Sequence, residues 1–188
     1  MSVWWHIASV PLALFVANGG EWFIHKYILH GLGRKKTSFW SFHWHEHHGE
    51  VRRREHLDEA YHRSLLGWHA QSKEALGLFG LGLLHCPLLW WFPAYVVTIW
   101  ASMVLYYIVH KKSHLNAEWA KKWLPWHYDH HMGPQQDANW CVTFPWFDHL
   151  LGTRLPYLGT EREVKDRERR EQHRQRRAAQ KVAIETGS

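Results

Sequence analysis

The sequence contains few residues of the kinds that build thiolate sites, and charge is missing from two long stretches. Only two cysteines, Cys86 and Cys141, occur in 188 residues, which excludes a thiolate zinc cluster and argues against a disulfide framework. No Lys or Arg precedes Lys26, and residues 75–109 carry no formal charge. The N-terminus also lacks a basic region and a small-residue cleavage site, so we do not expect a cleaved signal peptide.

The uncharged stretches predict membrane helices. Residues 3–24 carry one charge, Glu21, and could cross a hydrocarbon core of about 30 Å. Residues 75–109 are too long for a single span, and Pro87 and Pro93 would interrupt a helix, so we predict two antiparallel helices at about 75–90 and 93–112. Tryptophans at the ends of these stretches are typical of membrane interfaces rather than of a soluble core. We therefore predict an all-α integral membrane protein with about three apolar spans or hairpin helices and a histidine-rich helical cap.

The placement of basic residues predicts an orientation. If the first span runs inward and the hairpin goes out and returns, all 23 Lys and Arg fall on one side of the membrane. The positive-inside rule then places the N-terminus and the hairpin turn outside, and the polar segments and C-terminus in the cytoplasm.

Two regions are predicted along the chain. Residues 1–158 form a membrane-embedded domain, and residues 159–188 form a charged cytoplasmic helix or tail. Such a run is usually solvated and could also lie against anionic headgroups. Acidic residues neutralise about half of its basic charge, which argues against nucleic-acid binding.

Histidine is abundant, with 18 in the chain, and most of these residues lie in four clusters at the predicted cytoplasmic ends of the helices. The clusters read "HKYILHG", "HWHEHH", "HKKSH" and "WHYDHHMG", and their histidines are His25, His30, His43, His45, His47, His48, His110, His114, His127, His130 and His131. The last two clusters have the spacings that place side chains on one helix face. A metal-scavenging tail would not be spread in this way. So many imidazoles exceed the needs of one metal ion and suit two, and imidazole binds iron, copper, nickel and zinc.

Each metal-bound imidazole also needs a partner for its second nitrogen. The polar residues within or near the clusters are the candidates for this role: Glu46, Asp129, Asp137 and Asn139. We interpret the isolated histidines as ordinary hydrogen-bonding groups, namely His6, His56, His62, His69, His149 and His173.

These clusters, together with "WHYDHHMGPQQDANWCVTFPWFDHLLGTR", resemble the histidine boxes of the fatty acid hydroxylase and sterol desaturase superfamily, which includes the beta-carotene hydroxylases. The resemblance covers residues 21–154. It implies a membrane-bound non-haem di-iron enzyme that uses O2 to hydroxylate or desaturate a C–H bond of a lipid, such as a fatty acyl chain, a sterol or a carotenoid. Zinc could replace iron at such a site.

The second cluster departs from that pattern. The superfamily has a histidine three residues before the histidine pair, and here that position is Trp44. On an ideal α-helix, His43 and the pair span about 140°, whereas His45 and the pair span about 160°. The difference slightly favours His43 as the ligand, and both alternatives stay open.

The expected oxidation of a lipid determines which cofactor and which electron donor the protein would need. Oxidation of an unactivated C–H bond requires a redox metal, because side chains cannot supply the oxidant. The chain has no flavin, nicotinamide, haem or iron–sulfur motif, so electrons would come from a separate ferredoxin or b-type cytochrome with its reductase. Basic residues near the clusters could dock such an acidic donor or anionic lipid: Lys35, Lys36, Arg52, Arg53, Arg54, Lys111, Lys112, Lys121 and Lys122. The alternative function is a non-redox zinc protein of the membrane, either a hydrolase or a metal transporter.

Overall fold

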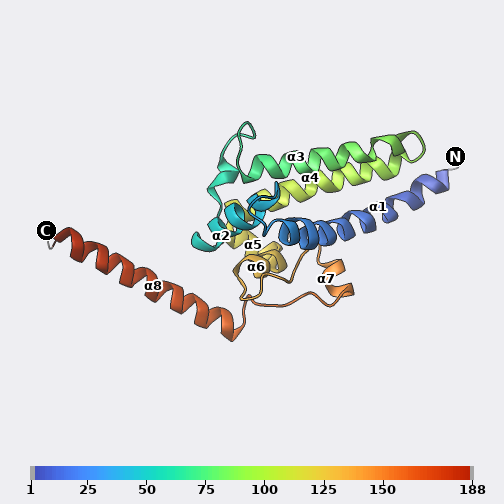
Figure 1. The fold of residues 1–188 in the computed structure, drawn as a ribbon. Helices are drawn as coiled ribbons and strands as arrows, with labels where there is room; N and C mark the ends of the chain where they lie inside the picture. The colour runs from blue at the N-terminus through green and yellow to red at the C-terminus, as the bar shows by residue number, and fades with distance from the viewer. Residues whose placement is uncertain (1–2, 187–188) are drawn as a thin grey trace. The chain divides into compact units, whose positions relative to one another are not determined.

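The computed structural model describes residues 3–186, and this part of the chain is helical without a β-strand (Figure 1). It divides into two compact units, residues 1–155 and 156–188. The all-α prediction is therefore confirmed.

Three long helices dominate the first unit. Helix α1 (Val3–Phe23) packs along α4 (Pro93–Leu115), and α3 (Ala70–His85) forms a hairpin with α4 through the short 3₁₀ helix η4 (Cys86–Trp90). The N-terminal end of α1 and the hairpin turn lie at the same end of this unit (Figure 1). The short helices α2 (Gly49–Arg53), α5 (Ala117–Trp123) and α6 (Pro125–Met132) lie at the other end (Figure 1).

The break at the two prolines was predicted, but the bounds of the first hairpin helix differ from 75–90. Helix α3 begins earlier because Gln71 and Lys73, although polar, are buried and bonded: Gln71 hydrogen-bonds the Tyr107 hydroxyl at 2.6 Å, and Lys73 Nζ donates to Glu46 Oε1 at 2.7 Å. The absence of charge therefore placed the start of the helix five residues too late, although its length of 16 residues was right. It ends earlier because the backbone tightens into η4 around Pro87.

Two helical segments are long and apolar enough to cross a membrane: Trp4–Leu32 and Pro93–Leu115. Helix α3 is not one of them, so the structure gives two candidate spans where about three apolar spans or hairpin helices were predicted. Large apolar side chains are nevertheless exposed on all three helices, including Trp4 (73%) and Leu84 (75%). Contiguous apolar surface of this kind marks a membrane or protein contact.

The first two histidine clusters lie on π-helices. Helix α1 continues as η1 (Ile24–Leu32), and η2 (Phe42–His48) follows the next loop. A π-helix pairs residue i with residue i+5, so side chains five apart share a face. This applies to His25 with His30 and to His43 with His48. The π-helices therefore aim these two pairs in common directions, which an α-helix would not do.

Short elements complete the end of the first unit where the histidines gather. They are α2 (Gly49–Arg53), η3 (Glu59–His62), α5 (Ala117–Trp123), α6 (Pro125–Met132) and α7 (Trp146–Leu150). Asn116 caps α5 by accepting a hydrogen bond from Trp119 N at 2.9 Å. Pro125 then begins α6 at the position where a helix tolerates proline.

The loop of residues 133–145 is fixed to α1 by buried polar groups. Glu21 Oε2 accepts hydrogen bonds from Val142 N and Thr143 N, both at 3.0 Å. Asp148, which is fully buried, accepts from Trp140 N and Cys141 N at 2.8 Å. These bonds set the position of the loop's own carbonyl groups, which face the histidines.

The second unit contains one long helix, α8 (Glu161–Thr186). Thr160 Oγ1 accepts from Glu163 N at 3.3 Å, and salt bridges one turn apart, such as Arg162 with Asp166, follow along its surface.

Candidate metal centre

Eleven buried histidines gather at one end of the first unit in three overlapping groups, in each of which one nitrogen per ring lies within 4.8 Å of the others. The first group consists of His25, His30, His43, His48 and His130. The second group consists of His47, His110, His114 and His131, and the third of His56, His114 and His127. The first and second groups adjoin, since the rings of His48 and His131 have centroids 4.3 Å apart.

The ring nitrogens are spaced as ligands of a common ion would be. In the first group, His25 Nε2 lies 3.0 Å from His43 Nε2, and His48 Nε2 lies 3.1–3.2 Å from those of three other members: His30, His43 and His130. His114 Nε2 in the second group lies 3.2 Å from His110 Nε2 and 3.0 Å from His127 Nε2. Around an ion bound at 2.0–2.1 Å, neighbouring nitrogens would be about 3.0–3.4 Å apart. His127 therefore adjoins the second group, and its ring also lies beside those of His110 and His131, with centroids 4.9 and 4.6 Å away.

The other ring nitrogen of several histidines faces an acceptor, which fixes the tautomer. His25 Nδ1 donates to Trp140 O at 2.6 Å, and His130 Nδ1 donates to Ala138 O at 2.7 Å. His114 Nδ1 donates to His56 O at 2.9 Å. With the proton held at Nδ1, the Nε2 lone pairs point at one another and repel unless a cation lies between them. This arrangement fits metal binding better than it fits a hydrogen-bonded histidine core.

Two buried carboxylates accept hydrogen bonds from the Nδ1 atoms of histidines in the second group. Asp58 Oδ2 accepts from His47 Nδ1 at 2.8 Å, and Glu74 Oε1 accepts from His110 Nδ1 at 2.5 Å. Tyr61 also donates to Glu74 Oε2 at 2.5 Å. Carboxylate–imidazole pairs of this kind orient ligands and raise their basicity. Neither Asp58 nor Glu74 was predicted from the sequence, because neither lies within a histidine cluster.

The four residues predicted as hydrogen-bond partners of the imidazoles mainly contact basic side chains. Glu46 is half-exposed and pairs with Lys73, whereas Asp129 is buried and pairs with Arg154 at 2.7 Å. Asn139 accepts from Arg154 Nη1 and Leu155 N, holding the chain after the loop of residues 133–145. Asp137 lies nearest to an imidazole, 3.6 Å from His30 Nδ1, and receives both of its shorter hydrogen bonds from Arg34.

The two alternatives in the second cluster, His43 and His45, lie in different surroundings. His43 is buried within the first group, while His45 is exposed and its Nε2 lies 3.1 Å from Arg34 O. Ten of the eleven predicted ligands, all except His45, belong to the three groups. His56, interpreted from the sequence as an ordinary hydrogen-bonding residue, is instead fully buried beside His114, and no helical spacing signalled it.

Burial keeps the imidazoles neutral. It lowers the pKa of His130 to about 4, and burial with neighbouring histidines holds the pKa values of His43, His48 and His131 well below the usual range. Burial would raise the pKa of Asp58, but the hydrogen bond and charge of His47 bring it below its usual value. The rings of His43, His48, His130 and His131 are therefore held in the neutral form that metal binding requires.

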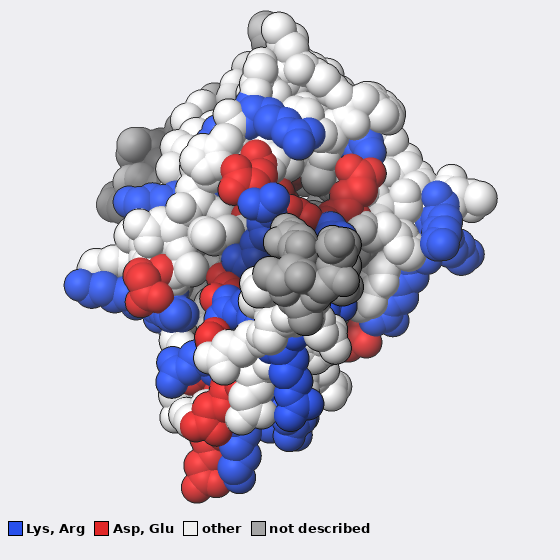
Figure 2. Space-filling model, turned by 90° about the vertical axis from the view of Figure 1, so that its left-hand side faces the viewer, with Lys and Arg blue, Asp and Glu red and all other residues white. Residues whose placement is uncertain are grey.

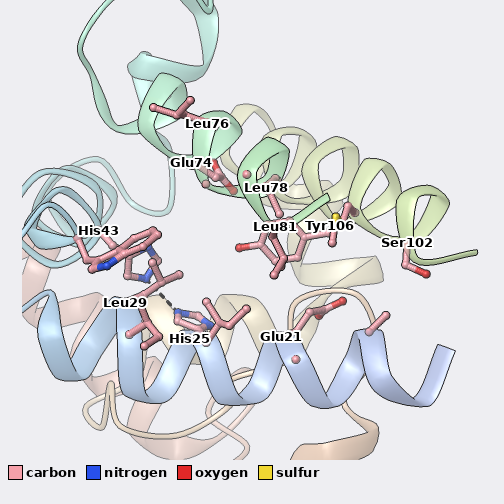
Figure 3. A pocket seen from close by; sticks show the side chains of 18 of the residues that line it. Glu21, His25, Leu29, His43, Glu74, Leu76, Leu78, Leu81, Ser102 and Tyr106 are labelled. Atoms are coloured by element: carbon pink, nitrogen blue, oxygen red, sulfur yellow. Dashed lines mark hydrogen bonds between the residues drawn. The ribbon is translucent and has the colours of Figure 1, made fainter. Parts of the chain in front are cut away.

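A cavity of about 850 Å³ ends at the histidines (Figure 3). It runs between α1, α3 and α4, and its walls are mostly apolar side chains. His25 and His43 of the first group and His47 of the second group line one end, while Ser102 lies toward the other (Figure 3). The cavity therefore reaches histidines of both groups.

Comparison of the chain with protein-family models, with curated proteins and with solved structures finds no match.

Proposed function

We propose that the protein is a membrane-bound, non-haem di-iron oxygenase that hydroxylates or desaturates a C–H bond of a lipid. One observation carries the proposal: a group of five buried imidazoles adjoins a group of four, with His127 beside the second group, and His25, His43 and His47 of these groups line an apolar cavity. The resemblance of the four histidine clusters to the fatty acid hydroxylase and sterol desaturase superfamily supports the same assignment.

The residues present fit two metal ions. The first set would be His25, His30, His43, His48 and His130, and the second His47, His110, His114, His127 and His131. Iron bound there would supply the redox chemistry that C–H oxidation needs and that side chains lack. The protein itself contributes fixed Nε2 lone pairs, backbone and carboxylate acceptors behind them, and an apolar cavity that excludes water.

The lining of the cavity suggests what part of a lipid enters it. Among the described residues, none of those lining the cavity is Lys or Arg. Its two carboxylates are already bonded, Glu21 to the loop of residues 133–145 and Glu74 to Tyr61 and His110. An anionic headgroup would be buried there without a partner, at a high free-energy cost. We propose that the portion of the substrate inside the cavity is uncharged and elongated.

Filling the cavity should block turnover without removing metal. Gly80 lines it, and a Cβ built there meets nothing within 4 Å. Gly80→Phe is expected to raise KM for a long lipid by about tenfold or more, since it occupies the space of a chain, while metal content stays unchanged. Leu83→Phe, also on α3 but at an exposed position that does not line the cavity, is the matched control. Equal kinetics in both variants would contradict the substrate path.

The electron donor is proposed to be a separate acidic ferredoxin or b-type cytochrome. Figure 2 shows Lys and Arg side chains, with Asp and Glu side chains among them, on the surface that it draws. Not all predicted docking residues are available. Arg52 Nη1 donates to the carbonyls of His131 and Gly133 at 2.9 Å, so charge reversal there would disturb the second group. Lys35, Lys36 and Lys122 are exposed and are the better positions to reverse.

We propose that the histidine end is cytoplasmic and that the hairpin turn is outside. Cys86 lies in that turn, partly exposed, whereas Cys141 is buried. A membrane-impermeant thiol reagent is therefore expected to label Cys86 in intact cells. In a Cys86→Ser background, Ser2→Cys should be labelled from outside and Ser188→Cys only after lysis, both positions lying outside the described residues. Labelling of Ser188→Cys in intact cells would reverse the orientation.

Oxygen uptake tests the function directly. Iron-loaded protein in lipid, supplied with reductant and a donor protein, is expected to consume O2 and to incorporate one oxygen atom from ¹⁸O2 into a hydroxylated lipid, or to form a double bond. Metal-dependent hydrolysis without O2 uptake would instead favour the zinc hydrolase. Metal binding with neither activity would favour transport.

A further inference from the structure

The loop that precedes α3 exposes three large apolar side chains within four residues. Leu65 is 49% exposed, Leu66 91% and Trp68 70%. Single apolar side chains are ordinary on a protein surface, but a contiguous apolar patch marks a contact with a membrane or with another protein. We call residues 64–69 the apolar loop.

The loop's own hydrogen bonds hold it in this conformation. His69 Nε2 donates to Ser64 O at 2.8 Å and closes the loop, and Leu66 N donates to Ser64 Oγ at 3.1 Å. Gly67 has a φ of 154°, which residues with a Cβ seldom adopt, and a Cβ there would meet the ring of His69 at 3.1 Å. The apolar loop is therefore a closed turn that keeps Leu66 at the surface.

The apolar loop is attached to the wall of the cavity. The ring of Trp68 has its centroid 6.0 Å from that of Phe39, which lines the cavity. Lys73 Nζ lies 5.6 Å from the centroid of the Trp68 ring, a favourable contact between a cation and an aromatic face. These contacts fix the loop beside the cavity and the start of α3.

Contacts between α3 and α4 give the depth of the loop along the proposed span. Gln71 hydrogen-bonds the Tyr107 hydroxyl at 2.6 Å, and Glu74 Oε1 accepts from His110 Nδ1 at 2.5 Å, so the start of α3 is level with the last turns of α4. The 23 residues of α4 rise about 34 Å, slightly more than a hydrocarbon core of about 30 Å. If α4 crosses the membrane, the apolar loop lies at the boundary between hydrocarbon and headgroups on the histidine side.

The exposed apolar surface continues from the loop along α3. Phe79 and Leu83 are four residues apart on one face of the helix, and both are exposed without lining the cavity. Figure 1 shows the loop before α3 at the histidine end of the first unit, on the side away from α1. A lipid chain that covers this face of α3 would therefore meet the apolar loop at its headgroup end.

We propose that the apolar loop inserts into the interface of the leaflet on the histidine side, with Leu65, Leu66 and Trp68 between the headgroups and the acyl chains. Tryptophan beside a basic residue is typical of such interfaces, and exposed Arg63 adjoins the loop. The inference rests on the membrane location in the proposed function. It assigns the anchoring contact beside the cavity to a loop that belongs to no span.

The test measures the depth of the loop in a bilayer. Leu66→Cys in a Cys86→Ser background is labelled with an environment-sensitive fluorophore, Cys141 being buried, and the full-length protein is placed in phosphatidylcholine vesicles. The vesicles carry a nitroxide either near the headgroup or deep in the acyl chain. An interfacial segment is buried by about 5–10 Å, so the shallow nitroxide should quench about twofold more than the deep one.

Two matched positions provide the controls. Phe79→Cys, on the exposed face of α3, should be quenched more by the deep nitroxide. Glu118→Cys, on α5 at a side chain that is 83% exposed, should be quenched by iodide in the water and by neither lipid.

The outcomes distinguish the inference from the proposed function. A Leu66→Cys label that iodide quenches and neither lipid quenches would overturn the insertion of the loop alone. A label with apolar emission that neither lipid nor iodide quenches would also overturn it, since another protein or a second copy of the chain would then cover the loop. A Phe79→Cys label that neither lipid quenches would instead contradict the membrane location on which the proposed function depends.

Discussion

Replacing His43 with alanine is expected to empty the first metal centre and abolish turnover, whereas replacing His45, two residues away, should change neither. His43 is buried, with its Nε2 3.0 Å from His25 Nε2 and 3.2 Å from His48 Nε2. His45 is exposed and contacts only the carbonyl of Arg34 among the hydrogen bonds of its ring. Both substitutions remove one imidazole from the same π-helix, so the pair is a matched comparison.

The measurement is metal content per chain, with turnover of a lipid substrate as the second readout. We expect the His43→Ala variant to lose about one metal ion per chain and His45→Ala to keep two. Alanine at His30, His114 or His130 should act like alanine at His43, and His173→Ala on α8 should have no effect. Loss of metal in His45→Ala with retention in His43→Ala would reverse the assignment of the ligand. Full metal content and activity in His130→Ala would contradict the site as a whole.

The second large effect is expected at Asp58, which lies outside the histidine clusters. Its Oδ2 accepts from His47 Nδ1 and its Oδ1 accepts from Ala60 N, both at 2.8 Å, so both oxygens are in use. In Asp58→Asn only one oxygen remains, and an amide N–H must face one of the two donors. The charge that strengthens His47 as a ligand is also lost. We expect metal affinity to fall about 10–100-fold.

Glu46→Gln provides the control for Asp58→Asn. It removes the same charge from a half-exposed carboxylate that pairs with Lys73 and that lies inside the second histidine cluster. Metal affinity in this variant should stay within about twofold of the wild type, because Glu46 pairs with Lys73 and not with an imidazole of the groups. Competition with a chelator measures both affinities, and circular dichroism checks that both variants are helical. Equal affinities in the two variants would show that Asp58 only caps η3.

The helices and the composition of the site followed from local patterns. Uncharged stretches, prolines and histidine spacings predicted the helical hairpin and ten of the histidines that the structure brings together. These features depend on short-range sequence, which is why they could be recognised. The start of the first hairpin helix was less accurate, because Gln71 and Lys73 are buried through contacts with distant residues.

The remaining features depend on contacts between segments far apart in the chain. The π-helical turns that pair His25 with His30 and His43 with His48 have no simple sequence signal. Asp58 reaches His47 because η3 packs against the end of α4, where Asp58 N donates to His114 O at 3.0 Å. The left-handed backbone at His56 likewise has no glycine to signal it.

The most direct test of the account is the iron content and the iron environment of protein purified from iron-supplied cells. Metal analysis should give two iron ions per chain, and X-ray absorption at the iron edge should show a coordination shell dominated by imidazole nitrogen. In the His43→Ala variant, the iron content and the imidazole signal should both fall but not disappear, because the second centre keeps its ligands. A wild-type protein with one ion or none, or with a shell dominated by oxygen or sulfur, would contradict the two imidazole-built centres.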